Sequence, residues 1–256
     1  MKKVKSVSRN ISEILFIDIE TCALASNYKA LNETAKKHWD QKADRLKKPN
    51  DSDFGASKDV FYKKRAGIYA EFSRVVCISV GYVDVLSKHK AIVNTKTFFH
   101  LNERDLLLEF ADFLNLNTVS QGISFLCGHN LREFDIPFIC RRMLINNVQL
   151  PDFIRISGKK PWQISFIIDT LELWKFGDYK SYISLDLLCS ILNVTSPKSE
   201  MMGSDVHDFF WVKKDYESIC RYCELDVFST AQVYLKLKQI YQSIQIEYSS
   251  KSVLST

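Results

Sequence analysis

Acidic side chains interrupt segments of this chain that otherwise have the apolar pattern of core-forming strands and helices. Asp18 and Glu20 follow the apolar run 14–17, and Asp226 interrupts the apolar surface of a predicted C-terminal helix. An ionised carboxylate that leaves water is unfavourable unless it is paired or bound to a metal. The fold of this chain must therefore either bring a cation to these positions or leave them exposed.

The first of these segments, residues 13–21, predicts a β-strand. Its residues alternate between two faces, and Ile14, Phe16, Asp18 and Glu20 share one of them. Both carboxylates then lie on one face at the C-terminal end of the strand. Taken alone, they also fit exposed residues at a strand end, where many strands become polar.

The last segment, from Asp215 to about Gln245, predicts a long helix. Tyr222 and Asp226 are four residues apart and so lie on one face of it. Alone, Tyr222 also fits a half-buried aromatic residue, and Asp226 could pair with Arg132 or with Arg221.

A third acidic position, Asp135, opens a predicted helix over 135–146 that has Pro137 in its first turn. A predicted strand at 123–127 precedes it. Asp135 could simply cap this helix. However, none of the four carboxylates has an obvious Lys or Arg partner in sequence, and hard divalent cations prefer oxygen ligands. The pattern favours two divalent metal ions, Mg²⁺ or Mn²⁺, and a phosphodiester substrate.

The remaining pattern predicts an α/β fold with both antiparallel and parallel strands. A hairpin is expected from strands at 75–83 and 91–100, then a helix capped by Asn102, and a further strand at 164–168. We expect a basic tail at 1–11, a single domain at 12–247 and a disordered tail at 248–256. The polar segment 27–70 is predicted to be a peripheral insertion, either a charged surface or a nucleic-acid track.

Composition adds little about the partner but does indicate the compartment. The net charge of +5 is mild for a nucleic-acid-binding protein. The seven cysteines are an odd number within mostly apolar runs, which indicates reduced thiols in a cytoplasmic protein. No run is long and uncharged enough to span a bilayer, so no membrane association is expected.

Three motifs occur in order along the chain: D-x-E, Asn followed by an aromatic residue and Asp, and Y-x-x-x-D. They are carried by Asp18 and Glu20, by Asn130, Phe134 and Asp135, and by Tyr222 and Asp226. In this respect the chain resembles the DEDD 3′-to-5′ exonuclease superfamily, which implies a ribonuclease H-like mixed five-stranded sheet flanked by helices. Arg221 stands where the histidine branch of that superfamily has its histidine, so the resemblance is to the tyrosine type. Segments 70–81, 169–175 and 196–198 further resemble stand-alone predicted exonucleases related to the proofreading domain of family B DNA polymerases.

The resemblance implies a role for each matching residue. Asp18, Glu20 and Asp226 would hold the first metal ion, with Asp18 bridging to a second ion that Asp135 reaches directly or through water. Tyr222 would orient the attacking water. Substrate contacts would come from Thr21, Asn130, Phe134 and Lys198, although Phe134 also fits the core and Lys198 a solvated surface.

The activity that the resemblance implies is removal of nucleoside 5′-monophosphates from 3′ ends of single-stranded DNA. Two alternatives stay open at this level. One is an exoribonuclease acting on small RNA, because the sequence reveals no contact to a 2′-hydroxyl. The other is a module that binds nucleic acid without cleaving it, although such a module would be expected to lack a carboxylate that this chain retains.

Overall fold

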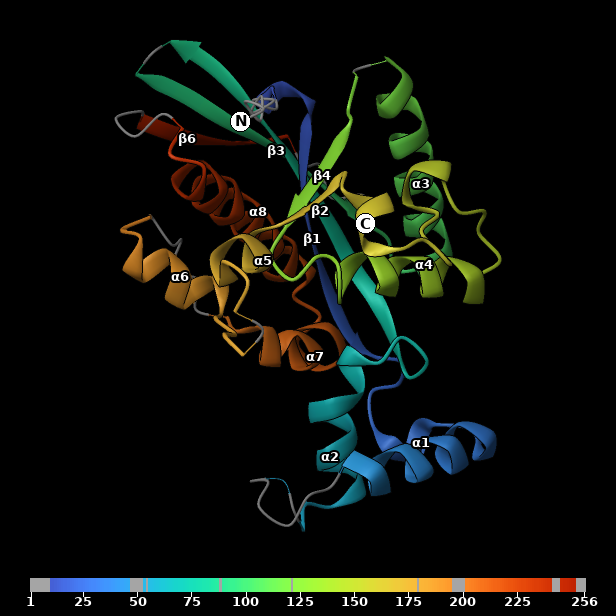
Figure 1. Cartoon of the computed structure of the whole chain (residues 1–256). Coiled ribbons are helices and arrows are strands. Elements are labelled where there is room, and N and C mark those ends of the chain that lie inside the picture. Colours follow the sequence, from blue (N-terminus) through green and yellow to red (C-terminus); the bar gives the residue numbers. More distant parts are fainter. Residues whose placement is uncertain are drawn as a thin grey trace.

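The computed structural model describes residues 10–46, 53, 55–87, 89–120, 122–178, 180–194, 201–240 and 245–251. Within them, one mixed sheet of six strands runs in the order β5-β4-β1-β2-β3-β6 (Figure 1). Its strands are β1 Ile14–Ala23, β2 Ser73–Ser87, β3 Lys90–Phe99, β4 Phe125–Gly128, β5 Ile167–Asp169 and β6 Gln245–Ser250. β1 pairs antiparallel with β2 and parallel with β4, so the predicted mixed α/β sheet is confirmed.

Helices cover both faces of this sheet, with α3 and α4 on one side and α5, α6 and α8 on the other (Figure 1). The helices are α1 Glu33–Leu46, α2 Lys58–Arg65, α3 Glu103–Ser120, α4 Asp135–Ile145, α5 Thr170–Lys175, α6 Leu185–Ile191, α7 Val206–Asp208 and α8 Tyr216–Leu237. Among the described residues, no helix is both long enough and apolar enough to cross a membrane.

The alternation predicted along β1 is confirmed by its packing. Leu15, Ile17 and Ile19 are buried in the core that includes α3 and α4. Ile14 and Phe16 are buried in the core that includes α8. Because side chains alternate along a strand, Asp18 and Glu20 point to the same face as Phe16, toward α8. The register of β1 with β2 shifts between Glu20 and Thr21, so this regular alternation ends at Glu20.

Gly81 of β2 lets α8 approach the sheet closely. A Cβ atom at this position would lie 2.7 Å from Cγ1 of Val227, the residue next to Asp226. Any side chain at Gly81 would therefore push α8 away from the sheet.

The C-terminal region differs from the prediction. Helix α8 ends at Leu237 instead of near Gln245, and Gln239 just after it has a left-handed backbone with φ of 55°. Residues 245–250 then form β6, parallel to β3, so the sheet has one strand more than expected. The tail predicted to be disordered from 248 is thus wrong for 248–250, and residues 252–256 lie outside the described part.

Buried Glu224 of α8 connects this helix to the added strand. Its carboxylate accepts hydrogen bonds from the hydroxyls of Tyr248 and Ser250 in β6. It also accepts one from Oγ1 of Thr97 in β3, at 2.9 Å. Glu224 therefore anchors α8 to β3 and β6, and it lies two residues from both Tyr222 and Asp226.

The polar segment that the sequence marks as an insertion has a small apolar core of its own. Trp39 of α1 is fully buried and its ring makes an edge contact with that of Tyr62 in α2, the centroids 5.3 Å apart. At the other predicted boundary, Ile11 is buried against the α8 core, so the expected tail cannot extend to residue 11. Residues 1–9 lie outside the described part.

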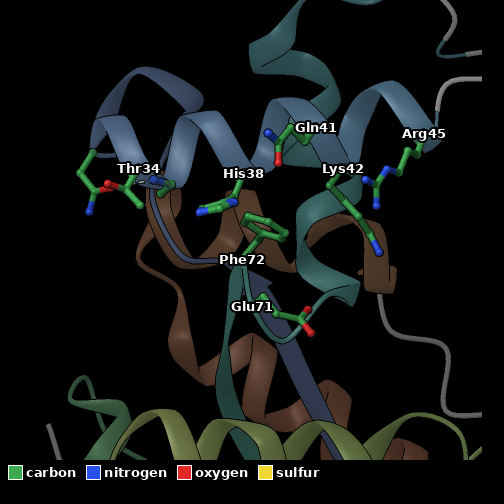
Figure 2. A pocket seen from close by; sticks show the side chains of 9 residues that line it. Thr34, His38, Gln41, Lys42, Arg45, Glu71 and Phe72 are labelled. Carbon is green, nitrogen blue, oxygen red and sulfur yellow. Dashed lines mark hydrogen bonds between the residues drawn. The ribbon is translucent and has the colours of Figure 1, made fainter.

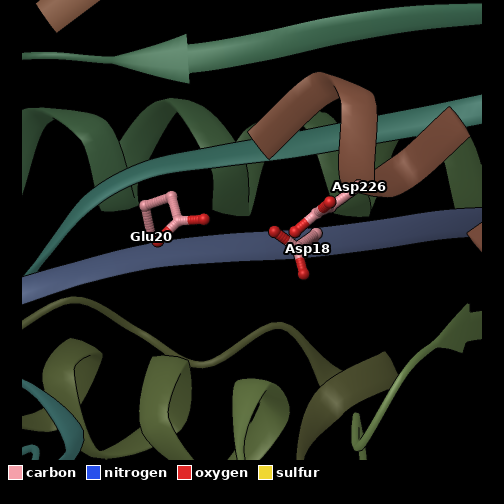
Figure 3. A group of neighbouring side chains, drawn as sticks. All are labelled: Asp18, Glu20 and Asp226. Carbon is pink, nitrogen blue, oxygen red and sulfur yellow. The ribbon is translucent and has the colours of Figure 1, made fainter. Parts of the chain in front are cut away.

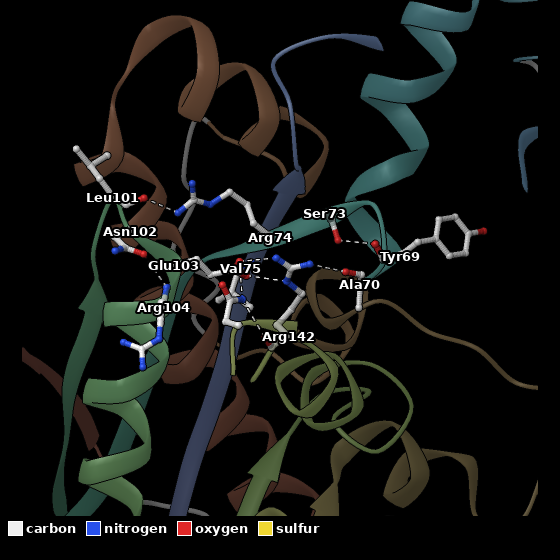
Figure 4. A network of polar contacts seen from close by, with 11 residues as sticks. Tyr69, Ala70, Ser73, Arg74, Val75, Leu101, Asn102, Glu103, Arg104 and Arg142 are labelled. Carbon is white, nitrogen blue, oxygen red and sulfur yellow. Dashed lines mark hydrogen bonds and ion pairs between the residues drawn. The ribbon is translucent and has the colours of Figure 1, made fainter. Parts of the chain in front are cut away.

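A buried ion pair connects α3 and α4 with the segment that follows the insertion and begins β2 (Figure 4). Arg142 of α4 donates from Nε and Nη2 to the carboxylate of Glu103 in α3, at 2.9 and 2.5 Å. It also donates from Nη1 to the carbonyl oxygen of Ala70 at 2.8 Å. Glu103 in turn accepts the backbone N–H of Val75 at 2.7 Å. One buried pair thus fixes α3, α4 and the start of β2 relative to one another.

Candidate active site

Three carboxylates predicted from the sequence meet between β1 and α8 (Figure 3). Asp18, Glu20 and Asp226 each offer one oxygen, and these oxygens all lie within 4.8 Å of one another. Figure 3 shows the carboxyl group of Asp226 descending from α8 onto that of Asp18, with Glu20 beside them on the same strand. The spacing of three such oxygens suits a single metal ion.

Asp135 reaches the same region from the start of α4. It is buried, and burial raises the pKa of its carboxyl to about 7, with a further rise from Asp169 and Asp226. Hydrogen bonds from its own backbone amide and from that of Ile19 act in the opposite direction on this pKa. The contact with Ile19 places Asp135 against the stretch of β1 that carries Asp18 and Glu20. Phe134, not Asp135, is the residue that precedes the helix as its N-cap.

Repulsion between the carboxylates raises their pKa values in addition to the effect of burial. Burial raises the pKa of Asp18 and of Glu20 well above the ordinary range, and Cys223 and Asp226 raise both further. The Cys223 thiol donates to Oδ2 of Asp18 at 3.3 Å. Sequence reasoning missed this contact, although Cys223 lies three residues before Asp226, which is a helical neighbour spacing.

No cationic side chain in the described part of the chain neutralises the cluster. Among the described residues, Asp18, Glu20, Asp135 and Asp226 have no Lys, Arg or His nitrogen within salt-bridge distance. Arg132, one suggested partner of Asp226, donates instead to the carbonyl oxygen of Ile167. A set of oxygen donors with this much uncompensated charge fits a hard divalent cation.

Tyr222 and Asp226 are adjacent on α8, as the four-residue spacing predicts. Burial raises the pKa of Asp226 to about 7, Asp186 raises it further, and a hydrogen bond from Tyr222 lowers it. Burial and then the charge of Asp226 raise the pKa of the Tyr222 phenol. The phenol is therefore a proton donor at neutral pH. Asp186, on the neighbouring helix α6, is a further carboxylate near this site, and no sequence motif had indicated it.

Asp169 shapes the turn between β4 and α4. Its carboxylate accepts the backbone N–H groups of Asn130 at 2.9 Å, Arg132 at 3.0 Å and Leu171 at 3.0 Å. It is thus the N-cap of α5 and also supports the Asn130 turn. Asn130 has a left-handed backbone with φ of 63°, a conformation that Asn tolerates better than most residues.

His129, next to this turn, has a structural environment. Its ring nitrogens lie 2.9 Å from Oγ1 of Thr170 and 3.0 Å from the carbonyl oxygen of Ile183. Burial lowers its pKa, so the imidazole is neutral at physiological pH. Both nitrogens have partners within the fold, which indicates a structural role for His129.

A cleft of about 270 Å³ opens beside the carboxylates. Thr21 and Phe134, two predicted substrate contacts, line it together with Glu20. The hydroxyl of Thr21 donates to the carbonyl oxygen of Gly67 at 2.8 Å, so its side chain also ties β1 to the insertion. The other cleft residues are Ile19, Cys22, Ala23, Lys63, Lys64, Gly67, Ile68, Gly203, Ser204 and His207.

Of the two remaining predicted substrate contacts, Asn130 is not among the described residues that line this cleft. Asn130 is half-buried in the turn described above. Lys198 lies outside the described residues. Lys63 and Lys64 of α2 do line the cleft, which brings part of the insertion to the carboxylate cluster.

The raised pKa values predict that the metal-free protein is less stable at pH 8 than at pH 5.5. Asp135 and Asp226 titrate at about 7 in the folded protein, against an ordinary value of 3.8. Between these values the folded state binds more protons than the unfolded state, so the free energy of unfolding falls as pH rises. Above about 7 the full cost of the buried charges is present. We expect Mg²⁺ or Mn²⁺ to raise the melting temperature more at pH 8, where the ligands need not lose protons.

Thermal unfolding in EDTA across this pH range measures the effect. Other groups titrate as well, so the matched control is Asp226→Asn, which should show a shallower decline and less metal stabilisation. A decline equally steep in both proteins would assign the pH dependence to groups outside the cluster.

Comparison with known proteins covers most of the chain. A family model described as "Predicted 3′-5′ exonuclease related to the exonuclease domain of PolB" matches residues 68–254. A search of curated proteins found no match. Among solved structures, the family B DNA polymerase from the hyperthermophilic archaeon Pyrobaculum calidifontis is similar, with 17% identity and a TM-score of 0.55. The match covers 88% of this chain but only 24% of the polymerase chain, and it is consistent with the expected ribonuclease H-like fold.

Proposed function

Because this chain belongs to the family of predicted 3′-5′ exonucleases related to the exonuclease domain of PolB, we propose that it hydrolyses single-stranded DNA from the 3′ end. The products would be nucleoside 5′-monophosphates. The observation that carries the proposal is the cluster of Asp18, Glu20 and Asp226, with Asp135 beside it. Among the described residues, no Lys, Arg or His forms a salt bridge with these carboxylates. A cleft with an aromatic residue and two lysines adjoins this cluster.

The four carboxylates have the donor chemistry for two ions of Mg²⁺ or Mn²⁺. We assign Asp18, Glu20 and Asp226 to the first ion, and Asp18 with Asp135 to the second. When bound, such a pair of ions activates a water molecule and stabilises the departing oxygen of a phosphodiester. The protein's part is to hold the oxygen donors together despite their repulsion, which α8 and β1 do by packing against each other.

Tyr222 is proposed to orient the attacking water, as in the tyrosine branch of the DEDD enzymes. Its raised pKa makes the phenol unsuitable as a base and suitable as a hydrogen-bonding group. Arg221, the neighbour that would be histidine in the other branch, points elsewhere: its guanidinium lies over the ring of Tyr248, 4.5 Å from the centroid. No imidazole from this position competes for the role.

Substrate contacts are proposed for the residues beside the metal ligands. Phe134 is half-buried in the cleft, where its ring could stack on the terminal base. Thr21 lines the cleft. For Asn130 and Lys198, substrate contacts are proposed from the family resemblance alone.

The seven cysteines are free thiols, which supports a reducing, cytoplasmic location.

Cleavage of oligonucleotides labelled at either end tests the proposal. With Mg²⁺ or Mn²⁺ we expect a ladder of products shortened from the 3′ end, and faster cleavage of DNA than of RNA run in parallel. Faster cleavage of RNA would keep the chemistry and change the substrate. No cleavage with either metal would overturn the proposal.

Tyr222→Phe is expected to slow cleavage by about 10- to 100-fold, the range in which misplacement of a reacting group costs activity. The ring and its packing remain, so the melting temperature should change little. Single-turnover cleavage of a saturating oligonucleotide measures the rate. Tyr216→Phe on the same helix is the matched control, because the Tyr216 ring packs against Phe99 and Phe210 away from the carboxylates. Equal losses in the two variants would contradict a specific role for the Tyr222 hydroxyl.

A further inference from the structure

We propose that the insertion binds the DNA strand on the 5′ side of the scissile bond, through a basic groove at the start of α2. This inference rests on the proposed exonuclease function and extends it to a second binding surface. The groove is lined by Asn27, Tyr28, Lys29, Ser57, Lys58, Asp59 and Lys63, and has a volume of about 690 Å³. Clefts of this size commonly bind ligands.

Continuity with the cleft is the first argument. Lys63 lines both the cleft beside the carboxylates and the groove at the start of α2. A strand whose 3′ end lies at the carboxylates and that leaves across Lys63 therefore enters the groove. From Lys63 to Lys58 the helix extends this path by about 7.5 Å, at roughly 1.5 Å per residue.

Charge is the second argument. The groove has three lysines, Lys29, Lys58 and Lys63, against one lining carboxylate, Asp59. Among the described residues, Lys29 has no carboxylate within salt-bridge distance. Lys63 pairs with Asp59 at 3.2 Å and Lys58 with Asp40 at 2.6 Å. Such exposed pairs are worth about 1 kcal/mol or less, so a phosphate can recruit these ammonium groups at small cost.

The third argument is an aromatic ring among the lysines. Tyr28 is half-buried, and its hydroxyl donates to Asp40 at 3.0 Å while its backbone N–H donates to Asp59 at 2.9 Å. The Lys58 ammonium lies 5.4 Å from the centre of its ring. A fixed aromatic face beside cations is the combination that binds single strands without reading their sequence.

The insertion also has a second groove that can serve as a control for DNA binding. This second groove lies along α1 and is lined by Asn32, Thr34, Ala35, His38, Gln41, Lys42, Arg45, Glu71 and Phe72 (Figure 2). It too has cationic side chains beside an aromatic ring. None of its lining residues lines the cleft beside the carboxylates. Because the cleft and this second groove have no lining residue in common, a DNA strand bound at the carboxylates does not pass directly from the cleft into the second groove.

Binding of a 5′-labelled oligothymidylate of roughly 12 nucleotides, a length typical of single-strand sites, tests the proposal by fluorescence anisotropy. The Asp226→Asn protein is used so that the probe is not degraded. We expect Lys29→Ala/Lys58→Ala to weaken binding about 10-fold and to reduce the salt dependence by roughly one phosphate contact per lysine. Lys42→Ala/Arg45→Ala removes the same charge from the second groove and should change binding less than about twofold.

Cleavage assays separate this inference from the proposed function. In the otherwise unchanged protein, Lys29→Ala/Lys58→Ala should raise KM for the long oligonucleotide and leave cleavage of a dinucleotide unaltered. Equal weakening by the two double variants, or none by Lys29→Ala/Lys58→Ala, would overturn the groove even if the protein cleaves DNA. No cleavage together with a clear difference in binding would count against the hydrolysis and not against the groove.

Discussion

Asp18→Asn is expected to reduce cleavage by about 10³-fold or more while raising the melting temperature of the metal-free protein. Asp18 is the carboxylate assigned to both metal ions, and metal stabilisation of a transition state supplies several kcal/mol, so its loss costs about three powers of ten. The thermal gain follows because the Asp18 carboxylate is buried and is repelled by the carboxylates of Asp226, Asp135 and Glu20. An amide of the same shape removes that repulsion.

Single-turnover cleavage and thermal unfolding in EDTA at pH 8 measure the two effects on one preparation. Asp186→Asn is the matched control, because Asp186 influences Asp226 electrostatically but does not belong to the cluster. It should lose no more than about 10- to 100-fold in activity, the usual cost of changing a group that acts on a metal ligand from beside it. A large drop in the melting temperature of Asp18→Asn would show that inactivity reflects unfolding, and would remove the support for a metal role.

Arg142→Ala is expected to destabilise the protein by about 3–5 kcal/mol, the usual cost of leaving one partner of a buried ion pair unpaired. Glu103 would keep its charge in a buried site, and the carbonyl oxygen of Ala70 would lose its donor. For a protein of this size the melting temperature should fall by roughly 10 °C. Denaturant and thermal unfolding at fixed pH measure the change.

Arg141→Ala provides the control in the adjacent position. Arg141 is exposed, so its removal should change stability by less than about 0.5 kcal/mol. If both variants lose a similar free energy of unfolding, the buried ion pair does not contribute more to stability than an exposed arginine on the same helix. Because Arg142 lies on the helix that begins with Asp135, residual activity of folded Arg142→Ala also reports how firmly that helix must be held.

The sequence was sufficient wherever a local period determined the outcome. The two-residue alternation of β1 predicted that Asp18 and Glu20 share a face, and the four-residue spacing on α8 predicted that Tyr222 and Asp226 are neighbours. Asn102 was predicted as a cap, and its Oδ1 does accept the backbone N–H of Arg104 at 3.0 Å. The catalytic roles of these residues stay predictions.

Features that depend on distant packing were not accessible in the same way. Strand β6 has two apolar residues, Ile246 and Tyr248, in a polar segment, and its partner β3 lies far away in sequence. Strand formation there depends on neighbours more than on intrinsic preference. Similarly, Asp186 approaches Asp226 because α6 packs on α8, and Trp39 is buried by residues that include Phe61 and Tyr62 of α2.

The hydrogen bonds between β6 and Glu224 of α8 have a consequence for the newly synthesised chain. Domains generally fold as units while synthesis proceeds from the N-terminus. Asp18 leaves the ribosome early, but Asp226 can meet it only after α8 has docked, and the partners of Glu224 on β6 emerge later still. We therefore expect the acidic centre to form at the end of folding, so that an incomplete chain does not yet have Asp18 and Asp226 together.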